Sequence, residues 1–516
     1  MVKGIHKLFY ILLTLFLGLF VAASFLVRAK YLYAVYGDTP VLEKQQLLLF
    51  IVTAAALLLA GLGLYALCRR LDRFSPSIII PAVLVVSFAI QTAIIFLFPR
   101  LPTDDSQTVL TLAQNMLYRG DYSSFQTAGY LHMFPFNFSI VLYLKTLLIL
   151  FPDNYLVIKF FNIGFTLVTT LMVYLLYKEL NVKSQSRDYS VLVLAALYAP
   201  ALFMNNLIYN DVIATAFLTS ALYFAVRFIK KGTLRHMLYA AVLLAFGNYF
   251  RSIGAIFLVA IAITILLHIR RIGVKKSALA LAVTVLVFMV PGWTQNLLLQ
   301  ATGKVEGSVN ANSAPVYMWL NMGVNQSTFG FWDNRQSYNI YQRQASYNKE
   351  KSTELFKAEI SRKLSEAEAG DLLKMYAKKL VWTWTEGTYQ MERYGIGNGS
   401  STFGRGMGAV GDKYSYTTFA TELFKGDSNA RVGLIWAMYA MNILMYGFTL
   451  VRLIGGLKSG RFAETPLVLV ILGFIAFYLL WEIKSRYLFP IYPLLLVMSY
   501  MGFKDMYDAI FAEKEG

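Results

Sequence analysis

Long apolar runs separated by short basic gaps dominate the pattern of hydrophobic and polar positions along this chain. A run of about 20 apolar residues is long enough to cross the hydrocarbon core of a bilayer as a helix. The runs predict spans at residues 8–27, 47–67, 78–98, 155–177, 191–207, 212–228, 278–298, 432–450, 466–481 and 487–501, and a tight helical hairpin over 237–267. The pattern therefore predicts an all-α polytopic membrane protein with about 12–13 transmembrane or membrane-embedded helices and an extracytoplasmic loop region.

The apolar segment 134–151 is shorter than the others and is bracketed by Pro135 and Pro152. If the loops on both sides of this region lie on the sides of the membrane that their charges indicate, either 134–151 or 155–177 does not cross fully. Irregular backbone at membrane depth is tolerated where it is buried in protein or lines a cavity. We therefore expect the shorter segment to be a re-entrant or broken helix.

Basic residues set the predicted orientation. Lys3 and Lys7 precede the first span, so the positive-inside rule places the N-terminus in the cytoplasm. That span is long enough to cross and lacks a convincing cleavage site, so we expect a retained anchor. Residues 28–46 then lie outside; their basic residues oppose this mildly, although Asp38 and Glu43 accompany them. The later basic gaps place the C-terminus in the cytoplasm.

The same alternation predicts five parts of the chain. They are an N-terminal three-helix membrane segment (1–98), a first large outer loop (99–133), a central membrane domain (134–298), an outer loop or cap region (299–430), and C-terminal membrane helices with a cytoplasmic tail (431–516). The cap region contains a helix-like stretch over 352–384. Its aromatic residues are expected to be interfacial anchors or sugar-stacking surfaces: Tyr376, Trp382, Trp384 and Tyr389.

Composition narrows the class of protein. The chain has 516 residues, of which 57% are hydrophobic and 15% charged, and its mean hydropathy is +0.53; these values exclude a soluble globular protein. A net charge of +18 resembles that of nucleic-acid-binding proteins. The Lys and Arg residues fall mainly in the gaps between spans, where membrane orientation explains them, so we expect membrane lipids and no nucleic acid as partners. Cys68 is the one cysteine, which excludes an internal disulfide and a zinc–thiolate cluster.

Two adjacent carboxylates, Asp104 and Asp105, follow directly after the span at 78–98. Pro102 separates them from that span, and the polar segment after them shows the spacing of an amphipathic helix. A carboxylate beside hydrocarbon is costly unless it faces water or a polar pocket. The pair therefore indicates an aqueous site that opens onto the bilayer; the alternative is a solvated acidic loop.

Unusual ionisable residues near the spans map to this same outer side: Asp104, Asp105, His132, Asp211, Arg251, Glu482, Lys484 and Arg486. A carboxylate can accept the proton of an acceptor hydroxyl, so Asp104 and Asp105 are the candidate catalytic residues. Guanidinium and ammonium groups can hold a phosphate, and arginine does so in a bidentate manner, which favours Arg251 and Arg486. The remaining residues of the set are candidate substrate-binding groups. The alternative for each cation alone is snorkelling to lipid headgroups.

Other signals are weaker. Asp104, Asp105 and His132 together could hold a divalent ion, but the sequence requires no metal and the cofactor stays unknown. Residues 406–411 fit GxGxxG outside any βαβ unit and are taken as a chance match. Residues 137–139 and 398–400 match glycosylation acceptors, a pattern that is common by chance.

The order of these features resembles the glycosyltransferase C superfold, in particular the polyprenyl-phosphate-sugar transferases of the family 39-like group, related to protein O-mannosyltransferases and lipid A aminoarabinose transferases. The resemblance covers roughly residues 100–501. It rests on the acidic pair at 104–105, His132-Met133-Phe134-Pro135, Tyr209-Asn210-Asp211, Arg251-Ser252-Ile253-Gly254, and the stretch from Arg486 to Pro493.

The resemblance implies an integral membrane glycosyltransferase that moves a sugar from a polyprenyl-phosphate donor to an extracytoplasmic acceptor with inversion. Asp104 or Asp105 would be the base, Arg486 and less surely Arg251 would hold the phosphate, and Asp211 would be a nearby polar group. The chain departs from the family in two extra spans before the acidic loop and in a single proline at position 135. It also lacks a recognisable acceptor signature, so a cell-wall polymer, a glycolipid or a protein all remain open as acceptors.

Three other functions compete with this interpretation. A transporter or flippase of lipid-linked sugars would also need charges near lipid phosphates, but it should place polar residues toward the middle of its helices. A polysaccharide polymerase would use the same chemistry. A structural subunit would bind a partner through the region 299–430 and would tolerate changes at the acidic pair.

Overall fold

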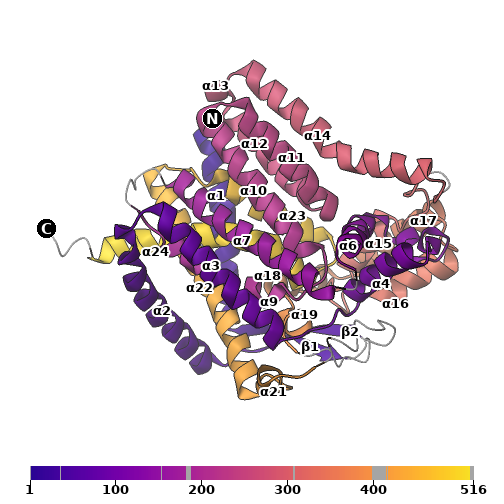
Figure 1. Ribbon diagram of the computed structural model, residues 1–516, viewed down its shortest axis with the longest axis horizontal. Helices are drawn as coiled ribbons and strands as arrows, with labels where there is room; N and C mark the ends of the chain where they lie inside the picture. The colour runs from indigo at the N-terminus through magenta and orange to yellow at the C-terminus, as the bar shows by residue number, and fades with distance from the viewer. Residues whose placement is uncertain are drawn as a thin grey trace.

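The computed structural model describes residues 2–34, 37–152, 154–181, 187–305, 308–397, 414 and 416–511. Within these ranges seven helices are long and apolar enough to cross a membrane. They are α1 (Val2–Ser24), α2 (Leu47–Arg69), α3 (Pro76–Leu97), α7 (Tyr155–Leu180), α10 (Asn210–Lys231), α14 (Val274–Ala301) and α22 (Asn429–Ser459) (Figure 1). The predicted helical, multi-pass membrane protein is confirmed.

Shorter helices complete the membrane bundle: α11 (Leu234–Phe250), α12 (Gly254–Leu267), α13 (Ile269–Ile272), α23 (Thr465–Leu480) and α24 (Tyr492–Phe511). Helix α10 lies at the centre of this bundle, because most of its side chains are buried and it packs against α7, α11 and the short helix η6 (Ser485–Ile491). At Gly247 of α11 an added Cβ would lie 2.6 Å from the Leu218 side chain of α10. Glycine therefore permits the close approach of these two helices.

Helix ends follow the local sequence. Pro76 occupies the first turn of α3, where its missing N–H costs nothing. Helices α10 and α22 end at Gly232 and Gly460, whose φ angles of 66° and 65° fall in the left-handed region that glycine adopts readily. Lys230 stands in the last turn of α10, where a cation interacts favourably with the helix dipole.

Two predicted membrane segments are broken. The pair 123–133 and 135–150 bends by 105°, and the break falls between α5 (Tyr130–Met133) and α6 (Phe138–Leu150), with η3 (Pro135–Asn137) between them. The break falls at the start of the segment 134–151 that was predicted to be re-entrant or broken, and residues 138–150 themselves form one continuous helix. The continuous span expected at 191–207 was wrong: it consists of α8 (Ser190–Ala196) and α9 (Ala199–Met204), and Pro200 stands in the first turn of α9, where its missing N–H is tolerated.

Residues 28–46, expected as an outer loop, largely form an antiparallel hairpin of β1 (Val27–Ala34) and β2 (Gly37–Lys44), with Val27 paired to Lys44. Lys30 lies 2.5 Å from Glu43 and Arg28 lies 3.5 Å from it, so two of the basic residues that opposed the predicted orientation share one carboxylate within the hairpin. Tyr31 packs edge-on against Trp382, with 4.8 Å between the ring centroids. The hairpin therefore belongs to the core.

The remaining elements fall mainly within residues 99–133 and 299–430, which the sequence predicts to lie outside the membrane: α4 (Asp105–Tyr118), η2 (Ser123–Phe125), α15 (Val316–Gly323), α16 (Asn334–Tyr338), η4 (Asn339–Gln344), α17 (Lys349–Glu366), α18 (Ala369–Thr385), α19 (Met391–Tyr394) and α21 (Phe419–Leu423); η1 (Leu71–Arg73) follows α2. The stretch predicted as helix-like over 352–384 is divided between α17 and α18. Trp382 and Trp384 are 0% and 1% exposed and Tyr389 is 3% exposed. These three aromatic residues are core residues, so their expected role as interfacial or sugar-stacking surfaces was wrong. The motif at 406–411 and the acceptor match at 398–400 lie outside the described residues.

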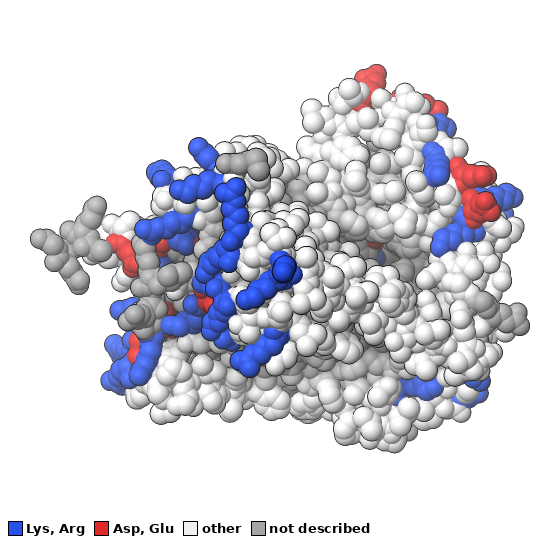
Figure 2. All heavy atoms as spheres, turned by 90° about the horizontal axis from the view of Figure 1, so that it is seen from above, with Lys and Arg blue, Asp and Glu red and all other residues white. Residues whose placement is uncertain are grey.

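Charged side chains gather toward the two ends of the long axis, and a broad band of uncharged side chains separates them (Figure 2). The end near the C-terminus carries mostly Lys and Arg, whereas the opposite end carries both signs. An uncharged belt between two charged ends is the surface expected of a protein embedded in a bilayer.

Candidate active site

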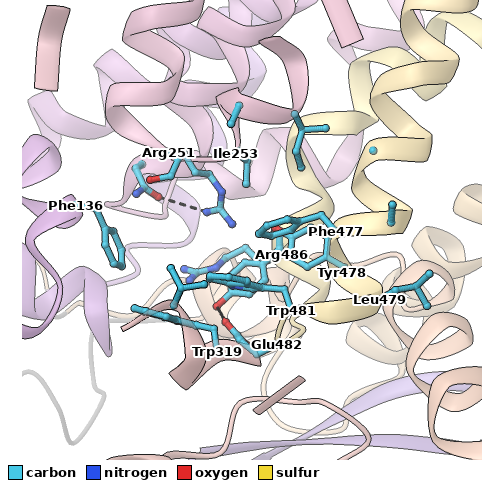
Figure 3. Close-up of a pocket in the computed structure, with 18 of the residues that line it drawn as sticks. Phe136, Arg251, Ile253, Trp319, Phe477, Tyr478, Leu479, Trp481, Glu482 and Arg486 are labelled. Atoms are coloured by element: carbon cyan, nitrogen blue, oxygen red, sulfur yellow. Dashed lines mark hydrogen bonds between the residues drawn. The ribbon is translucent and has the colours of Figure 1, made fainter. Parts of the chain in front are cut away.

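A cavity of about 1170 Å³ extends from the membrane helices into the outer region. One end is lined by apolar side chains of α1, α12 and α23, among them Leu12, Val259 and Leu472. The other end is lined by Asp105, Arg251, Glu482 and Arg486 together with aromatic side chains (Figure 3). The cavity therefore matches a ligand with an apolar tail and a charged head.

Asp105 is the first residue of α4, where the helix dipole favours a negative charge. Its Oδ1 accepts a hydrogen bond from the Tyr130 hydroxyl at 3.2 Å. That hydroxyl accepts from Asn137 Nδ2 at 2.8 Å, and Asn137 Oδ1 accepts from the Tyr209 hydroxyl at 3.0 Å. All four side chains line the cavity. The broken segment after α5 thus orients the Asp105 carboxylate toward the space where a substrate would lie.

Asp104 has a different environment. Its Oδ2 lies 2.5 Å from Arg393 Nε and its Oδ1 lies 2.9 Å from Arg393 Nη2. Arg393 Nη1 in turn donates to Asp38 of the β hairpin at 2.7 Å. Burial opposes ionisation of Asp104, but the hydrogen bonds and charge of Arg393 outweigh it and lower the pKa of this carboxyl group. Asp104 is not among the described residues that line the cavity.

Two arginines of the cavity wall share one buried carboxylate that lies behind them. Asp211, in the first turn of α10 and 0% exposed, accepts a hydrogen bond through Oδ1 from Arg251, and its Oδ2 lies 3.9 Å from Arg486 Nη1. The Nε atoms of both arginines are buried without a hydrogen-bond partner. Figure 3 shows the Arg251 and Arg486 side chains directed toward the same space. Two cations beside one anion leave a net positive charge and unused donors, which suits an anionic ligand.

The Arg486 guanidinium carbon lies 5.1 Å from the ring centroid of Tyr209 and 4.9 Å from that of Tyr394. The Arg251 guanidinium carbon lies 5.0 Å from the ring centroid of Tyr487. These aromatic faces fix both guanidinium groups. Arg486 is 2% exposed and the Arg251 side chain is 10% exposed, which is unlike arginines that snorkel to lipid headgroups.

The other predicted residues are dispersed. Glu482 lines the cavity and accepts from the Tyr487 hydroxyl at 2.6 Å, and burial raises its pKa. Lys484 lies over the ring of Trp332 at 5.0 Å and does not itself line the cavity. His132 does not line it either; burial lowers the pKa of its imidazole.

The structure therefore brings together Asp105, Arg251, Glu482 and Arg486, with Asp211 behind the arginines. The cavity lining does not include Asp104, His132 or Lys484. The described residues contain no group of three or more His, Cys, Asp or Glu side chains placed to hold a metal ion. Asp104, Asp105 and His132 are thus not assembled as the divalent-ion site considered above.

Sequence reasoning missed Arg393, the cavity tyrosine Tyr130, and the aromatic side chains Trp319 and Trp332. Trp319 stacks on Trp481 with 5.5 Å between ring centroids and an interplanar angle of 9°. Arg393 stands in a polar part of the outer region, where nothing nearby distinguishes it from a solvated arginine. Its role follows from contacts with two acidic residues that are distant in sequence.

Comparison with known proteins found one matching family and a similar solved structure. Residues 135–294 match the family of dolichyl-phosphate-mannose-protein mannosyltransferases. No curated protein matches the chain. Among solved structures, the archaeal oligosaccharyltransferase AglB from Archaeoglobus fulgidus, in complex with an inhibitory peptide and a dolichol-phosphate, is similar at 13% identity with a TM-score of 0.42. That match covers 85% of this chain and 51% of the AglB chain, so the present protein matches about half the length of that enzyme.

The matched segment runs from Pro135 at the helix break, through Asp211 and Arg251, to the second half of α14. It therefore includes two of the three groups that form the arginine–carboxylate cluster. Over residues 135–294 this chain is similar to the dolichyl-phosphate-mannose-protein mannosyltransferases, which confirms the resemblance drawn from its sequence.

Proposed function

We propose that this protein is an integral membrane glycosyltransferase that moves a sugar from a polyprenyl-phosphate donor to a hydroxyl group of an extracytoplasmic acceptor. One observation carries the proposal. Asp105 and the pair Arg251 and Arg486 line one cavity whose opposite end is apolar and lies among membrane helices. The two ends fit a lipid phosphate, and the match of residues 135–294 supports the same class of donor.

In this reaction the polyprenyl chain lies against α1, α12 and α23, and the phosphate lies between Arg251 and Arg486. The acceptor hydroxyl oxygen attacks the anomeric carbon and forms the new glycosidic bond. The bond between that carbon and the phosphate oxygen breaks, and polyprenyl phosphate leaves with the electron pair. The hydroxyl proton passes to Asp105 as general base. A single displacement of this kind inverts the anomeric configuration.

Each group around the reacting atoms has a physical role. The two guanidinium groups stabilise the negative charge that grows on the phosphate as the bond breaks. Asp211 holds both arginines in place and limits their mutual repulsion. Tyr130 and Asn137 orient Asp105. Asp104 is engaged by Arg393 on both oxygens and anchors the start of α4, so it is not the base.

The test uses the full chain purified into lipid nanodiscs, a panel of radiolabelled polyprenyl-phosphate sugars, and cell-envelope extract as the acceptor. Wild type should transfer label, Asp105→Asn should abolish transfer, and Arg486→Ala should reduce it strongly. Asp121→Asn removes a fully exposed acidic residue of the same loop and is the matched control. Protein-dependent movement of the donor across the bilayer without its consumption would show a transporter instead. Full activity of Asp105→Asn would refute the assigned base.

A further inference from the structure

We infer that the outer half of the cavity is the acceptor subsite and that its ligand is a saccharide, stacked on an aromatic wall formed by Trp319, Trp332 and Trp481. The inference rests on the proposed function, because it assigns the second substrate of that same cavity. The chain has seven tryptophans, and these three line the cavity. Trp319 comes from α15 and Trp332 from the segment before α16, so the outer region supplies part of the site.

The three rings are available to a ligand. Each is only partly buried, whereas Trp382 and Trp384 are 0% and 1% exposed in the core. Trp319 and Trp481 stack face to face, and Phe477 stacks on Trp481 with 4.9 Å between the ring centroids, so a ligand would meet the ring faces and edges that these contacts do not cover. Figure 3 shows Trp319 and Trp481 together on the side of the cavity opposite Arg251.

A sugar ring has the chemistry that this wall recognises. Its C–H groups carry partial positive charge and pack against the electron-rich face of an aromatic ring, while its hydroxyl groups need polar partners. Polar side chains line the same end of the cavity: Asn310, Ser313, Tyr338 and Lys349. Lys349 Nζ donates to the Asn310 carbonyl at 2.8 Å and to Ser313 Oγ at 3.1 Å, which holds this polar group together.

The position of the wall relative to the base supports an acceptor rather than the lipid tail. Trp319 lies 6.2 Å from Phe134 and 6.1 Å from Phe136, ring centroid to ring centroid. These two residues flank Pro135 at the helix break. Asn137 directly follows Phe136 and orients Asp105 through Tyr130. A ring stacked on Trp319 therefore lies on the side of the cavity that carries the base. The lipid tail has its own apolar surface among α1, α12 and α23.

A peptide acceptor fits this end less well. A peptide that is recognised by strand addition needs an exposed strand edge for its backbone hydrogen bonds. Among the strands in the described part of the chain, neither β1 nor β2 contributes to the cavity lining. The aromatic and polar side chains around Trp319 are better matched to a flat ring with several hydroxyl groups.

The test measures saccharide binding and donor binding separately, with the full chain in nanodiscs. Saturation-transfer NMR without donor is recorded for soluble di- to tetrasaccharides of glucose, galactose, mannose and arabinose, and for a serine- and threonine-containing peptide. The variants are Trp319→Leu, Trp332→Leu and the conservative Trp319→Phe. Trp293→Leu is the matched control, because Trp293 on α14 is 51% exposed and does not line the cavity.

We expect at least one saccharide to bind wild type and Trp293→Leu equally. Trp319→Leu and Trp332→Leu should each weaken binding about tenfold, the loss expected for one aromatic stacking contact, and Trp319→Phe should retain most of it. Affinity for the polyprenyl-phosphate sugar should not change in any variant. The inference is overturned if no saccharide binds, if Trp319→Leu binds as well as wild type, or if the peptide binds in a Trp319-dependent manner. If the proposed function is wrong, the protein should neither bind nor consume the donor. This result does not depend on the outcome of the saccharide-binding measurements.

Discussion

The guanidinium group of Arg393 binds both carboxylate oxygens of Asp104, at 2.5 Å and 2.9 Å. This bidentate ion pair gives the two adjacent acidic residues different environments. Asp104, with a φ angle of 54°, caps the N-terminus of α4, and the carboxylate of the next residue, Asp105, faces the cavity. Arg393 also forms an ion pair with Asp38, which belongs to the β hairpin. The hairpin thus helps to fix the start of the helix that carries the proposed base.

Asp105→Asn and Asp104→Asn should have different effects. Loss of a general base is expected to lower kcat about 10²–10⁴-fold, so Asp105→Asn should reduce kcat with little change in thermal stability. Asp104→Asn leaves Arg393 without one of its two carboxylate partners and should lower the unfolding temperature more than Asp105→Asn does. Steady-state transfer assays and thermal unfolding of the same preparations check this. Equal loss of kcat with equal stability in both variants would contradict the separate roles.

Acid pH should reveal the Arg393–Asp104 pair. The pKa of Asp104 is lowered in the folded protein, so its contribution to stability is present above the ordinary pKa of an aspartate, about 4, and is lost as the pH falls through the lowered value. In Arg393→Gln that lowering is removed. The contribution is then absent at every pH, so the variant should unfold at a lower temperature than wild type at neutral pH, and the difference between the two should shrink as the pH falls below about 4. Arg335→Gln removes an exposed arginine of the same region and should leave the profile unchanged.

Replacement of either cavity arginine by lysine should weaken the use of donor. Lysine keeps the charge but cannot make the bidentate contact of a guanidinium group with a phosphate. We expect Arg486→Lys and Arg251→Lys each to lower kcat/KM for the donor about 10–100-fold, the equivalent of one or two charge-assisted hydrogen bonds. Arg335→Lys, at an exposed position of the outer region, is the control. A wild-type value of kcat/KM in Arg486→Lys would exclude this residue as a phosphate ligand.

Gly502→Ala should destabilise the bundle. An added Cβ at Gly502 of α24 would lie 1.8 Å from the Phe448 carbonyl oxygen of α22, a backbone atom that cannot move without displacing the helix. Gly433→Ala offers a matched control on α22, because nothing lies within 4 Å of its added Cβ. Thermal unfolding in nanodiscs should show a lower midpoint for Gly502→Ala and no loss for Gly433→Ala, since alanine favours a helix by up to about 1 kcal/mol. Equal midpoints would mean that α22 and α24 can move apart enough to hold the added methyl group without loss of stability.

Most of the membrane fold could be predicted because its signals are local. The length of an apolar run decides whether a helix can span, and Pro135 with the charge alternation was enough to predict the break near residue 134. The hairpin at Val27–Lys44 could not be predicted. Its strands are stabilised by burial of Tyr31 against Trp382, a contact that no local pattern records.

The sequence could predict which ionisable residues lie at the same side of the membrane, and this was enough to predict part of the candidate site. Asp105, Asp211, Arg251 and Arg486 share one surface, and an ionisable residue at a membrane boundary stands out in an apolar chain. Which aspartate faces the cavity depends on where α4 begins and on Arg393, which lies far away in the sequence. The same holds for the tryptophans: the sequence favoured Trp382 and Trp384, and packing buried both.

The carboxylate that Arg251 and Arg486 share also affects release of the product in the proposed reaction. The proposed donor is a phosphodiester with one negative charge, whereas the product polyprenyl phosphate is a monoester with about −1.5 to −2 at neutral pH. Two guanidinium groups opposed by the single carboxylate of Asp211 attract the more highly charged species more strongly. The arrangement that assists bond cleavage therefore also retains the leaving group. In the proposed reaction we therefore expect polyprenyl phosphate to leave the site slowly, as product release does in many enzymes.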